Sequence, residues 1–330
     1  MTNSKHLTHC VTEVLCVSEV NGKAITMKRV LLIGGSGMLG SNIVVSNSAF
    51  ELYPTYLRNR ITHPRASQLD ISDRDSVLKR VETIQPEVIV HAGGMTKPTA
   101  CEKEPALAHR VNVEGTAHLV EAAKSVGARF IFLSSDLVFD GSAERYDEDS
   151  PTHPLSVYGH NKVEGEERVR TGSDDFAIVR TTVMYGWSSR YTESMAEWVL
   201  RGLQEGQELS MYHDQCRQFI LINDLVAALF ELIEMEDPST ETIHVAGPEL
   251  ISRYEFAQRL ARTFALPEAG IRSTLFDSTP QAAFTSKRLS LDTGKAARIL
   301  RTPMRGIDDG LRAMIALAEE GYRERFSRIF

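Results

Sequence analysis

From Met27 onward, short β-branched and aliphatic runs alternate with longer segments of helical period. A parallel sheet buries continuous apolar strands and connects them by crossover helices, so this alternation predicts an α/β fold with a Rossmann-type, doubly wound parallel sheet. The predicted strands are residues 30–33, 52–57, 87–91, 129–133, 176–180 and 241–245. The predicted helices among them are a helix that opens at 40–46 and helices 73–84, 106–126 and 156–170.

The alternation becomes less regular after about Gly186, where helices dominate. We therefore predict a smaller, mostly helical C-terminal substrate lobe beside the sheet domain, with helices 193–204 and 253–264. The expected division is 27–186 for the sheet domain, with 217–248 packing back onto it, and 187–216 together with 249–330 for the lobe.

The first 26 residues differ from the rest of the chain. They are polar, and Glu13 and Glu19 interrupt their only apolar stretch, which argues against a signal peptide. Met27 then leads directly into the first strand. We expect residues 1–26 to be either a disordered extension or the product of an upstream start codon.

Composition excludes several classes of function. The 330-residue chain has a formal net charge of -7 and no basic block, which argues against a nucleic-acid partner. No apolar run is long enough to span a bilayer, so no membrane partner is expected. Its 4 cysteines and 10 histidines show no zinc-ligand spacing, so we predict no metal and a reduced, cytoplasmic setting.

A glycine-rich turn joins the first strand to the first helix. Gly34 allows the tight turn, Gly37 lets the backbone approach a pyrophosphate, and Gly40 allows close helix packing. The helix N-terminus adds free N–H donors for the phosphates. The turn therefore predicts a dinucleotide site, with the sequence Gly34-Gly35-Ser36-Gly37-Met38-Leu39-Gly40.

A tyrosine and a lysine stand four residues apart on the helix predicted at 156–170. Tyr158 and Lys162 project from the same helix face, and a nearby ammonium is expected to lower the pKa of the phenol. Ser135 ends the preceding strand, where its hydroxyl can orient a carbonyl substrate. Alone, such a pair is more often a solvated surface pair; behind a dinucleotide turn it predicts proton transfer coupled to hydride transfer.

Cofactor preference is predicted from the end of the second strand. An NAD-selective site places an acidic residue there, whereas this chain has Arg58 with no acid nearby. The planar donor fork of arginine suits a 2′-phosphate. We therefore expect NADP(H) to be preferred, with NAD(H) as the alternative if Arg58 is only a solvated loop charge.

These motifs, in this order, resemble the extended short-chain dehydrogenase/reductase superfamily. The segment Ser134-Ser135-Asp136-Leu137-Val138-Phe139-Asp140-Gly141 is similar to Ser-Thr-Asp-Tyr-Val-Phe-Asp-Gly of its dTDP-4-dehydrorhamnose reductase branch. The resemblance implies Tyr158 as general acid, supported by Ser135 and Lys162. It also implies cofactor contacts at Asp70 and Ile71 for the adenine, at Ala92 and Gly93, and at Asn112 as a support for the lysine.

The resemblance further implies a small-molecule substrate, a keto group on a nucleotide-activated sugar or related ligand. Substrate contacts are expected at Thr96, Asp136, Val183, Gln215 and Arg217. Three sugar-facing positions depart from the branch: Leu137 replaces a tyrosine, Val183 replaces a tryptophan, and the segment 93–99 keeps only Thr96. The chemistry is thus better supported than the sugar.

Two other functions stay open. One is a nucleotide-sugar epimerase or dehydratase, which shares the tyrosine and lysine. The other is a non-catalytic, NADP-binding regulatory subunit that resembles the partner of methionine adenosyltransferase. A homodimer through the helix at 106–126 is expected by analogy alone.

Overall fold

The computed structural model describes residues 18–20, 23–25, 27–236 and 241–330. Before Met27, strands β1 (Ser18–Val20) and β2 (Lys23–Ile25) pair in antiparallel fashion. The remaining residues of the predicted disordered extension lie outside the described residues.

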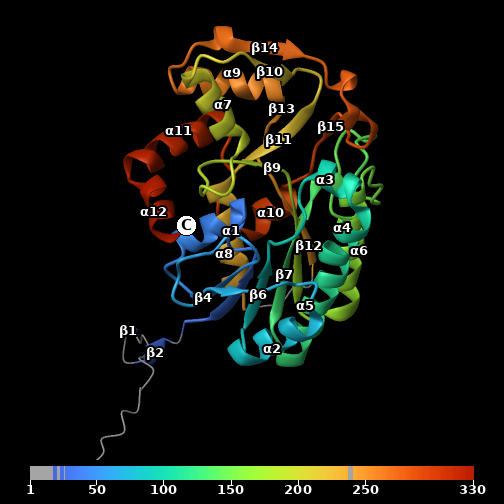
Figure 1. The fold of residues 1–330 in the computed structure, drawn as a ribbon, viewed down its shortest axis with the longest axis vertical. Helices are drawn as coiled ribbons and strands as arrows, with labels where there is room; N and C mark the ends of the chain where they lie inside the picture. Colours follow the sequence, from blue (N-terminus) through green and yellow to red (C-terminus); the bar gives the residue numbers. More distant parts are fainter. Residues whose placement is uncertain (1–17, 21–22, 26, 237–240) are drawn as a thin grey trace, which may run out of the picture.

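A seven-stranded parallel sheet forms the centre of the described chain (Figure 1). Strands β3 and β6 lie side by side at its middle, with Ile33 opposite His91, and the strand order reverses between them. In α/β sheets, ligands bind at such a switch point beyond the carboxyl ends of the strands. The predicted Rossmann-type fold is confirmed. In spatial order the strands are β12 (Glu241–Val245), β8 (Phe176–Thr181), β7 (Arg129–Ser135), β6 (Val88–His91), β3 (Arg29–Ile33), β4 (Glu51–Tyr56) and β5 (Ser67–Gln68).

Helices cover both faces of this sheet because alternate residues of each strand point to opposite sides. Leu31 and Ile33 of β3 belong to the core on one face, and Val30 and Leu32 belong to the core on the other. The first face is covered by α2 (Arg74–Ile84), α5 (Gly115–Val126) and α6 (Val157–Gly172). The second face is covered by α1 (Met38–Ser46) and α8 (Ile222–Glu234).

The helix predicted at 106–126 is interrupted. It comprises α4 (Pro105–His109), a π-helical segment at Arg110–Glu114, and then α5. Within the π segment, the side chain of Asn112 bonds to the backbone of Met95, a contact that helical periodicity cannot reveal. Such π segments occur frequently at functional sites.

The C-terminal lobe contains two small sheets as well as helices (Figure 1). One sheet joins β9 (Val183–Tyr185), β11 (Cys216–Leu221), β13 (Leu250–Ser252) and β15 (Arg288–Leu289). The other pairs β10 (Leu209–Tyr212) with β14 (Ile271–Thr274). The later α-helices are α7 (Met195–Gln204), α9 (Arg253–Thr263), α10 (Gly294–Ile299), α11 (Ile307–Glu319) and α12 (Tyr322–Ile329). Short helices occur at Pro98–Lys103 (α3), Asp136–Val138, Glu268–Gly270, Phe276–Ser278 and Pro280–Ala283.

The two parts of the chain are more interleaved than the predicted boundaries. Helix α12 returns to the sheet domain and packs against α1, and α10 packs against β12. The stretch 249–330 is therefore not confined to the lobe. None of the helices in the described part of the chain is both long and apolar enough to cross a membrane.

Candidate active site

One cleft brings most of the predicted site residues together. It has a volume of about 2220 Å³ and runs from the glycine turn along the ends of β6 and β7 to the lobe. Four predicted residues are not part of its lining, namely Gly40, Asn112, Gln215 and Arg217. The predicted residues that line it are Gly34, Ser36, Gly37, Met38, Leu39, Arg58, Asp70, Ile71, Ala92, Gly93, Thr96, Ser135, Asp136, Tyr158, Lys162 and Val183.

The glycine turn has a steric reason for its glycines. Gly34 has a φ of +83°, and a Cβ there would lie 2.6 Å from the Cα of Gly93. A Cβ on Gly40 would lie 2.1 Å from the Gly34 carbonyl oxygen. Helix α1 begins after Gly37 with no capping side chain, so its first N–H groups have no side-chain acceptor. A turn open to the cleft, followed by free helical donors, fits the pyrophosphate of a dinucleotide.

The end of β4 carries the predicted determinant of cofactor preference. Arg58 is exposed and lines the cleft, and the glycine turn is joined to β4 by the Gly35 N to Thr55 O hydrogen bond of 2.7 Å. Asp70 lines the same cleft, where its Oδ1 accepts hydrogen bonds from the Ser72 amide (2.9 Å) and hydroxyl (2.7 Å). These two side chains thus occupy the part of the cleft expected for the adenosine end of a dinucleotide.

The three predicted catalytic residues come from two adjacent elements. Ser135 is the last residue of β7, and Tyr158 and Lys162 lie on α6, whose first turn is capped by Ser156 (Gly159 N to Ser156 Oγ, 3.0 Å). Lys162 Nζ donates a 2.7 Å hydrogen bond to the carbonyl of Leu133 on β7. This bond ties the helix to the strand, so the three side chains share one end of the cleft.

The pKa of Tyr158 is raised, whereas the sequence predicted that it would be lowered. Burial raises the pKa of its phenol, the nearby Asp136 and Cys101 raise it further, and a hydrogen bond with Ser135 opposes the rise. Lys162 Nζ is directed to Leu133 O and lies 5.8 Å from the centroid of the Tyr158 ring, and the overall effect of the surroundings is a raised pKa of the phenol. The phenol therefore keeps its proton at neutral pH.

Lys162 is itself perturbed by its surroundings. Burial lowers the pKa of its ammonium to about 8, and Glu166, one turn further along α6, opposes this change. Nζ also lies 4.6 Å from the centroid of the Phe132 ring, a cation–π contact that favours the charged form. The lysine is thus close to its own titration point at physiological pH.

Glu166 anchors a buried ion cluster beneath the site. Its side chain is 0% exposed and accepts hydrogen bonds from Ser134 Oγ (2.6 Å) and from Arg180 Nε and Nη2 (2.9 and 2.7 Å). Arg170 Nη2 adds a fourth donor at 2.8 Å. The four hydrogen bonds to this carboxylate compensate for the free energy lost when it is removed from water, so the cluster joins α6 firmly to β7 and β8.

The side chain of Asn112 bonds to the loop that follows β6. Its Oδ1 accepts from the Met95 amide at 2.8 Å and its Nδ2 donates to the Met95 carbonyl at 3.0 Å. Asn112 thus holds this loop, which includes the predicted substrate residue Thr96. Among the described residues no direct hydrogen bond joins it to Lys162, and its predicted support of the lysine through a hydrogen-bonded network stays a prediction.

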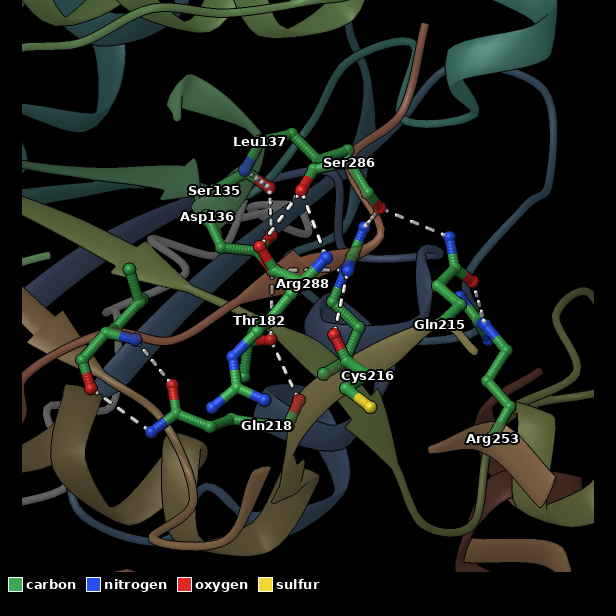
Figure 2. A network of polar contacts seen from close by, with 12 residues as sticks. Ser135, Asp136, Leu137, Thr182, Gln215, Cys216, Gln218, Arg253, Ser286 and Arg288 are labelled. Carbon is green, nitrogen blue, oxygen red and sulfur yellow. Dashed lines mark hydrogen bonds and ion pairs between the residues drawn. The ribbon is translucent and has the colours of Figure 1, made fainter. Parts of the chain in front are cut away.

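A polar network surrounds Asp136 (Figure 2). Its Oδ1 accepts from Ser135 Oγ at 3.0 Å, and its Oδ2 lies 3.1 Å from Thr182 Oγ1 and 3.8 Å from Arg217 Nε. Burial raises the pKa of the Asp136 carboxyl, and Arg217 opposes that rise. The carboxylate next to Ser135 is therefore held by three neighbours.

Gln215 and Arg217 lie behind the cleft wall, where both bond to a segment of the lobe. Each of the two residues is 2% exposed. Gln215 Nε2 donates a 3.5 Å hydrogen bond to the carbonyl of Ser286 (Figure 2), and Arg217 Nη2 donates to the same carbonyl. Gln218 likewise bonds to the backbone of Leu291: its Oε1 accepts from the Leu291 amide at 2.7 Å, and its Nε2 donates to the Leu291 carbonyl at 3.1 Å. These side chains fix the segment 286–291 against β11.

Sequence reasoning did not assign Thr182, Gln218 or Trp187. Thr182 and Trp187 line the cleft, and Gln218 holds the lobe segment just described. The hydrogen bonds of their side chains reach partners 36 to 127 residues away along the chain, as in the bonds from Thr182 to Gln218 and from Trp187 to Met314. Local patterns carry no signal for such contacts.

Known proteins of two kinds are similar to this chain. Methionine adenosyltransferase 2 subunit beta of Rattus norvegicus is 32% identical over 305 residues, 90% of each chain. A dTDP-4-dehydrorhamnose reductase of Aggregatibacter actinomycetemcomitans is 30% identical over 239 residues, 70% of this chain and 77% of that protein.

A solved structure shares the fold. The dTDP-4-dehydrorhamnose reductase of Bacillus anthracis str. Ames, in complex with NADP, superposes with a TM-score of 0.77 at 26% identity, covering 88% of this chain and 99% of that chain. Residues 27–319 match the family described as the RmlD substrate binding domain. The chain therefore belongs to the RmlD substrate-binding-domain family, within the extended short-chain dehydrogenase/reductase superfamily.

Proposed function

We propose that this protein is an NADPH-dependent reductase of a keto group on a nucleotide-activated sugar or a related small molecule. The observation that carries the proposal is that Ser135, Tyr158 and Lys162 line the same cleft as the glycine turn. A carbonyl seated between Ser135 and Tyr158 would accept hydrogen bonds from two hydroxyls, while a dinucleotide on the turn occupies the adjoining space.

The protonation of Tyr158 supports reduction. A general acid must hold a proton before the reaction, and burial raises the pKa of this phenol. When bound, the reduced dinucleotide would supply a hydride to the carbonyl carbon. Tyr158 gives its proton to the carbonyl oxygen, which becomes a hydroxyl, and the phenolate then recovers a proton from solvent. The adjacent Lys162 ammonium, when charged, stabilises that phenolate.

NADP(H) is the cofactor that the residues fit best. Arg58 lines the cleft and offers a donor fork for a 2′-phosphate, and the end of β4 provides no carboxylate for ribose hydroxyls. The related Bacillus anthracis reductase was solved with NADP. Binding of NAD(H) at lower affinity is compatible with the same glycine turn.

The proposed substrate contacts are Thr96, Asp136 and Val183, which line the cleft beside Tyr158. Val183 and Leu137 are small or apolar where the rhamnose branch carries aromatic side chains, so the sugar ring would meet a different wall. For this reason we propose the class of substrate rather than dTDP-4-dehydrorhamnose itself.

The test is NADPH oxidation with a panel of nucleotide-sugar ketones, using the wild type and Tyr158→Phe. We expect Tyr158→Phe to lose about a hundredfold to ten-thousandfold in turnover while its NADPH dissociation constant stays unchanged. The matched control is Tyr254→Phe, a phenol on α9 outside the cleft lining. Full activity in Tyr158→Phe would refute the assigned role.

A second candidate is a regulatory subunit. It is favoured by the similarity to methionine adenosyltransferase 2 subunit beta, which extends over 90% of the chain, against 70% for the curated reductase. Tight NADP binding without oxidation by any ketone of the panel, together with co-purification of a methionine adenosyltransferase catalytic chain, would support it. Copurified oxidised cofactor would instead indicate an epimerase or dehydratase.

A further inference from the structure

Helix α12 lies beyond residues 27–319, which match the family, yet it packs on the sheet domain (Figure 1). Tyr322 OH at its start donates to Asn42 Oδ1 at 2.8 Å and lies 3.0 Å from Ser46 Oγ. Asn42 in turn donates to the carbonyl of Met38, the first residue of α1, at 2.9 Å. The first turn of α12 is therefore anchored on the helix that follows the glycine turn.

The other end of α12 holds the segment after β4. The carbonyl of Ile329 accepts a 2.7 Å hydrogen bond from the Thr62 amide. The ring of Phe330 meets the ring of Tyr191 edge to face at 6.5 Å, and Tyr191 OH lies 3.4 Å from the carbonyl of Arg60. Of the backbone groups in the segment 60–62, the Thr62 amide is thus bonded to Ile329 of α12, and the Arg60 carbonyl is bonded to Tyr191, whose ring contacts the following residue Phe330.

This segment carries the predicted cofactor determinant. Arg58 lies only two residues before Arg60, at the end of β4 where a ribose is expected. In the described ranges, no hydrogen bond or ion pair holds the Arg58 side chain, so its placement depends on the backbone that carries it. Phe326 of α12 and Phe330, the residue that follows the helix, line the same cleft as Arg58, so the C-terminal helix forms a wall of the site.

We infer that α12 is a positioning element for the cofactor. By holding the segment 60–62, it places Arg58 for the 2′-phosphate of a phosphorylated dinucleotide. The inference rests on the NADP(H) preference stated under the proposed function, and it adds that this preference depends on a helix outside the matched family region.

The test compares the full chain with a chain that ends at Arg328. The shortened chain loses the Ile329 carbonyl and the Phe330 ring but keeps the Tyr322 and Phe326 anchors. Dissociation constants for NADPH and NADH are measured without substrate, from the fluorescence of the reduced nicotinamide. We expect the NADPH constant to rise about tenfold, as for one lost charge-assisted hydrogen bond, and the NADH constant to change less than about twofold. Full-length Arg328→Ala, which alters an exposed α12 side chain outside the cleft lining, should bind both as the wild type does.

A double-mutant cycle separates positioning from general stability. In an Arg58→Ala background, shortening the chain should no longer change the ratio of the NADPH and NADH constants. Equal loss for both cofactors, no change for either, or an undiminished effect in the Arg58→Ala background would each overturn the inference. Because no substrate is turned over, a protein that reduces no ketone still gives these constants, so the two proposals fail separately.

Discussion

Lys162 is expected to lower the stability of the fold at neutral pH. Burial lowers the pKa of its ammonium from 10.5 to about 8. This difference of about 2.5 units corresponds to about 3 kcal/mol of folding free energy. Below the folded-state pKa the lysine is charged in both states and the cost is fully present. As pH rises from that value to the unfolded pKa, the unfolded chain binds more protons, so the folded state gains stability.

The perturbation is Lys162→Met, which keeps an unbranched side chain but cannot titrate. Free energies of unfolding are measured with urea for the wild type and the variant near pH 7 and near pH 10. Between these conditions the wild type recovers most of the destabilisation caused by the buried lysine, about 2 to 3 kcal/mol, and the variant has none to recover. The stability of the variant relative to the wild type should fall by that amount.

Other alkaline titrations cancel in this comparison because both proteins contain them. Lys79→Met on the exposed face of α2 controls for the loss of a lysine as such. A difference between Lys162→Met and the wild type that is the same at both pH values would refute the reasoning, because it would mean that Lys162 titrates alike in the folded and unfolded states.

Two further predictions concern packing around the site. Gly40→Ala should abolish NADPH binding and lower the unfolding temperature, since a Cβ there would lie 2.1 Å from the Gly34 carbonyl oxygen. Intact NADPH binding in this variant would contradict the turn geometry. The control is Gly206→Ala, where a Cβ would have nothing within 4 Å and the free energy of unfolding should fall by only about 1 kcal/mol. Glu166→Gln should lower the free energy of unfolding in urea by about 3 kcal/mol, because it leaves the buried Arg180 without its counter-charge. The control is Glu167→Gln at the exposed neighbouring position. Equal losses of unfolding free energy in the two variants would contradict the stabilising role of the buried ion cluster.

The central sheet could be read from the chain because its strands are buried on both faces. Such strands are apolar over nearly their whole length, as at 30–33 in β3 and 88–90 in β6, and that pattern is local. The sheets of the lobe could not be read in this way. Strand β11 pairs with β9, β13 and β15, which lie far from it in sequence, and it contains the polar residues Arg217 and Gln218. Their burial is compensated by backbone partners at Ser286 and Leu291, which no local pattern indicates.

The sequence by itself determined the participants of the site, namely the glycine turn and the spacing of Tyr158 and Lys162. Both are local features, in which backbone sterics and the helical repeat decide the outcome. Only the tertiary structure decided their chemical state. Burial beside Asp136 keeps the Tyr158 phenol protonated, and the Leu133 carbonyl accepts a hydrogen bond from the ammonium of Lys162. Desolvation and long-range partners set proton affinities, and both exist only once distant segments have packed together.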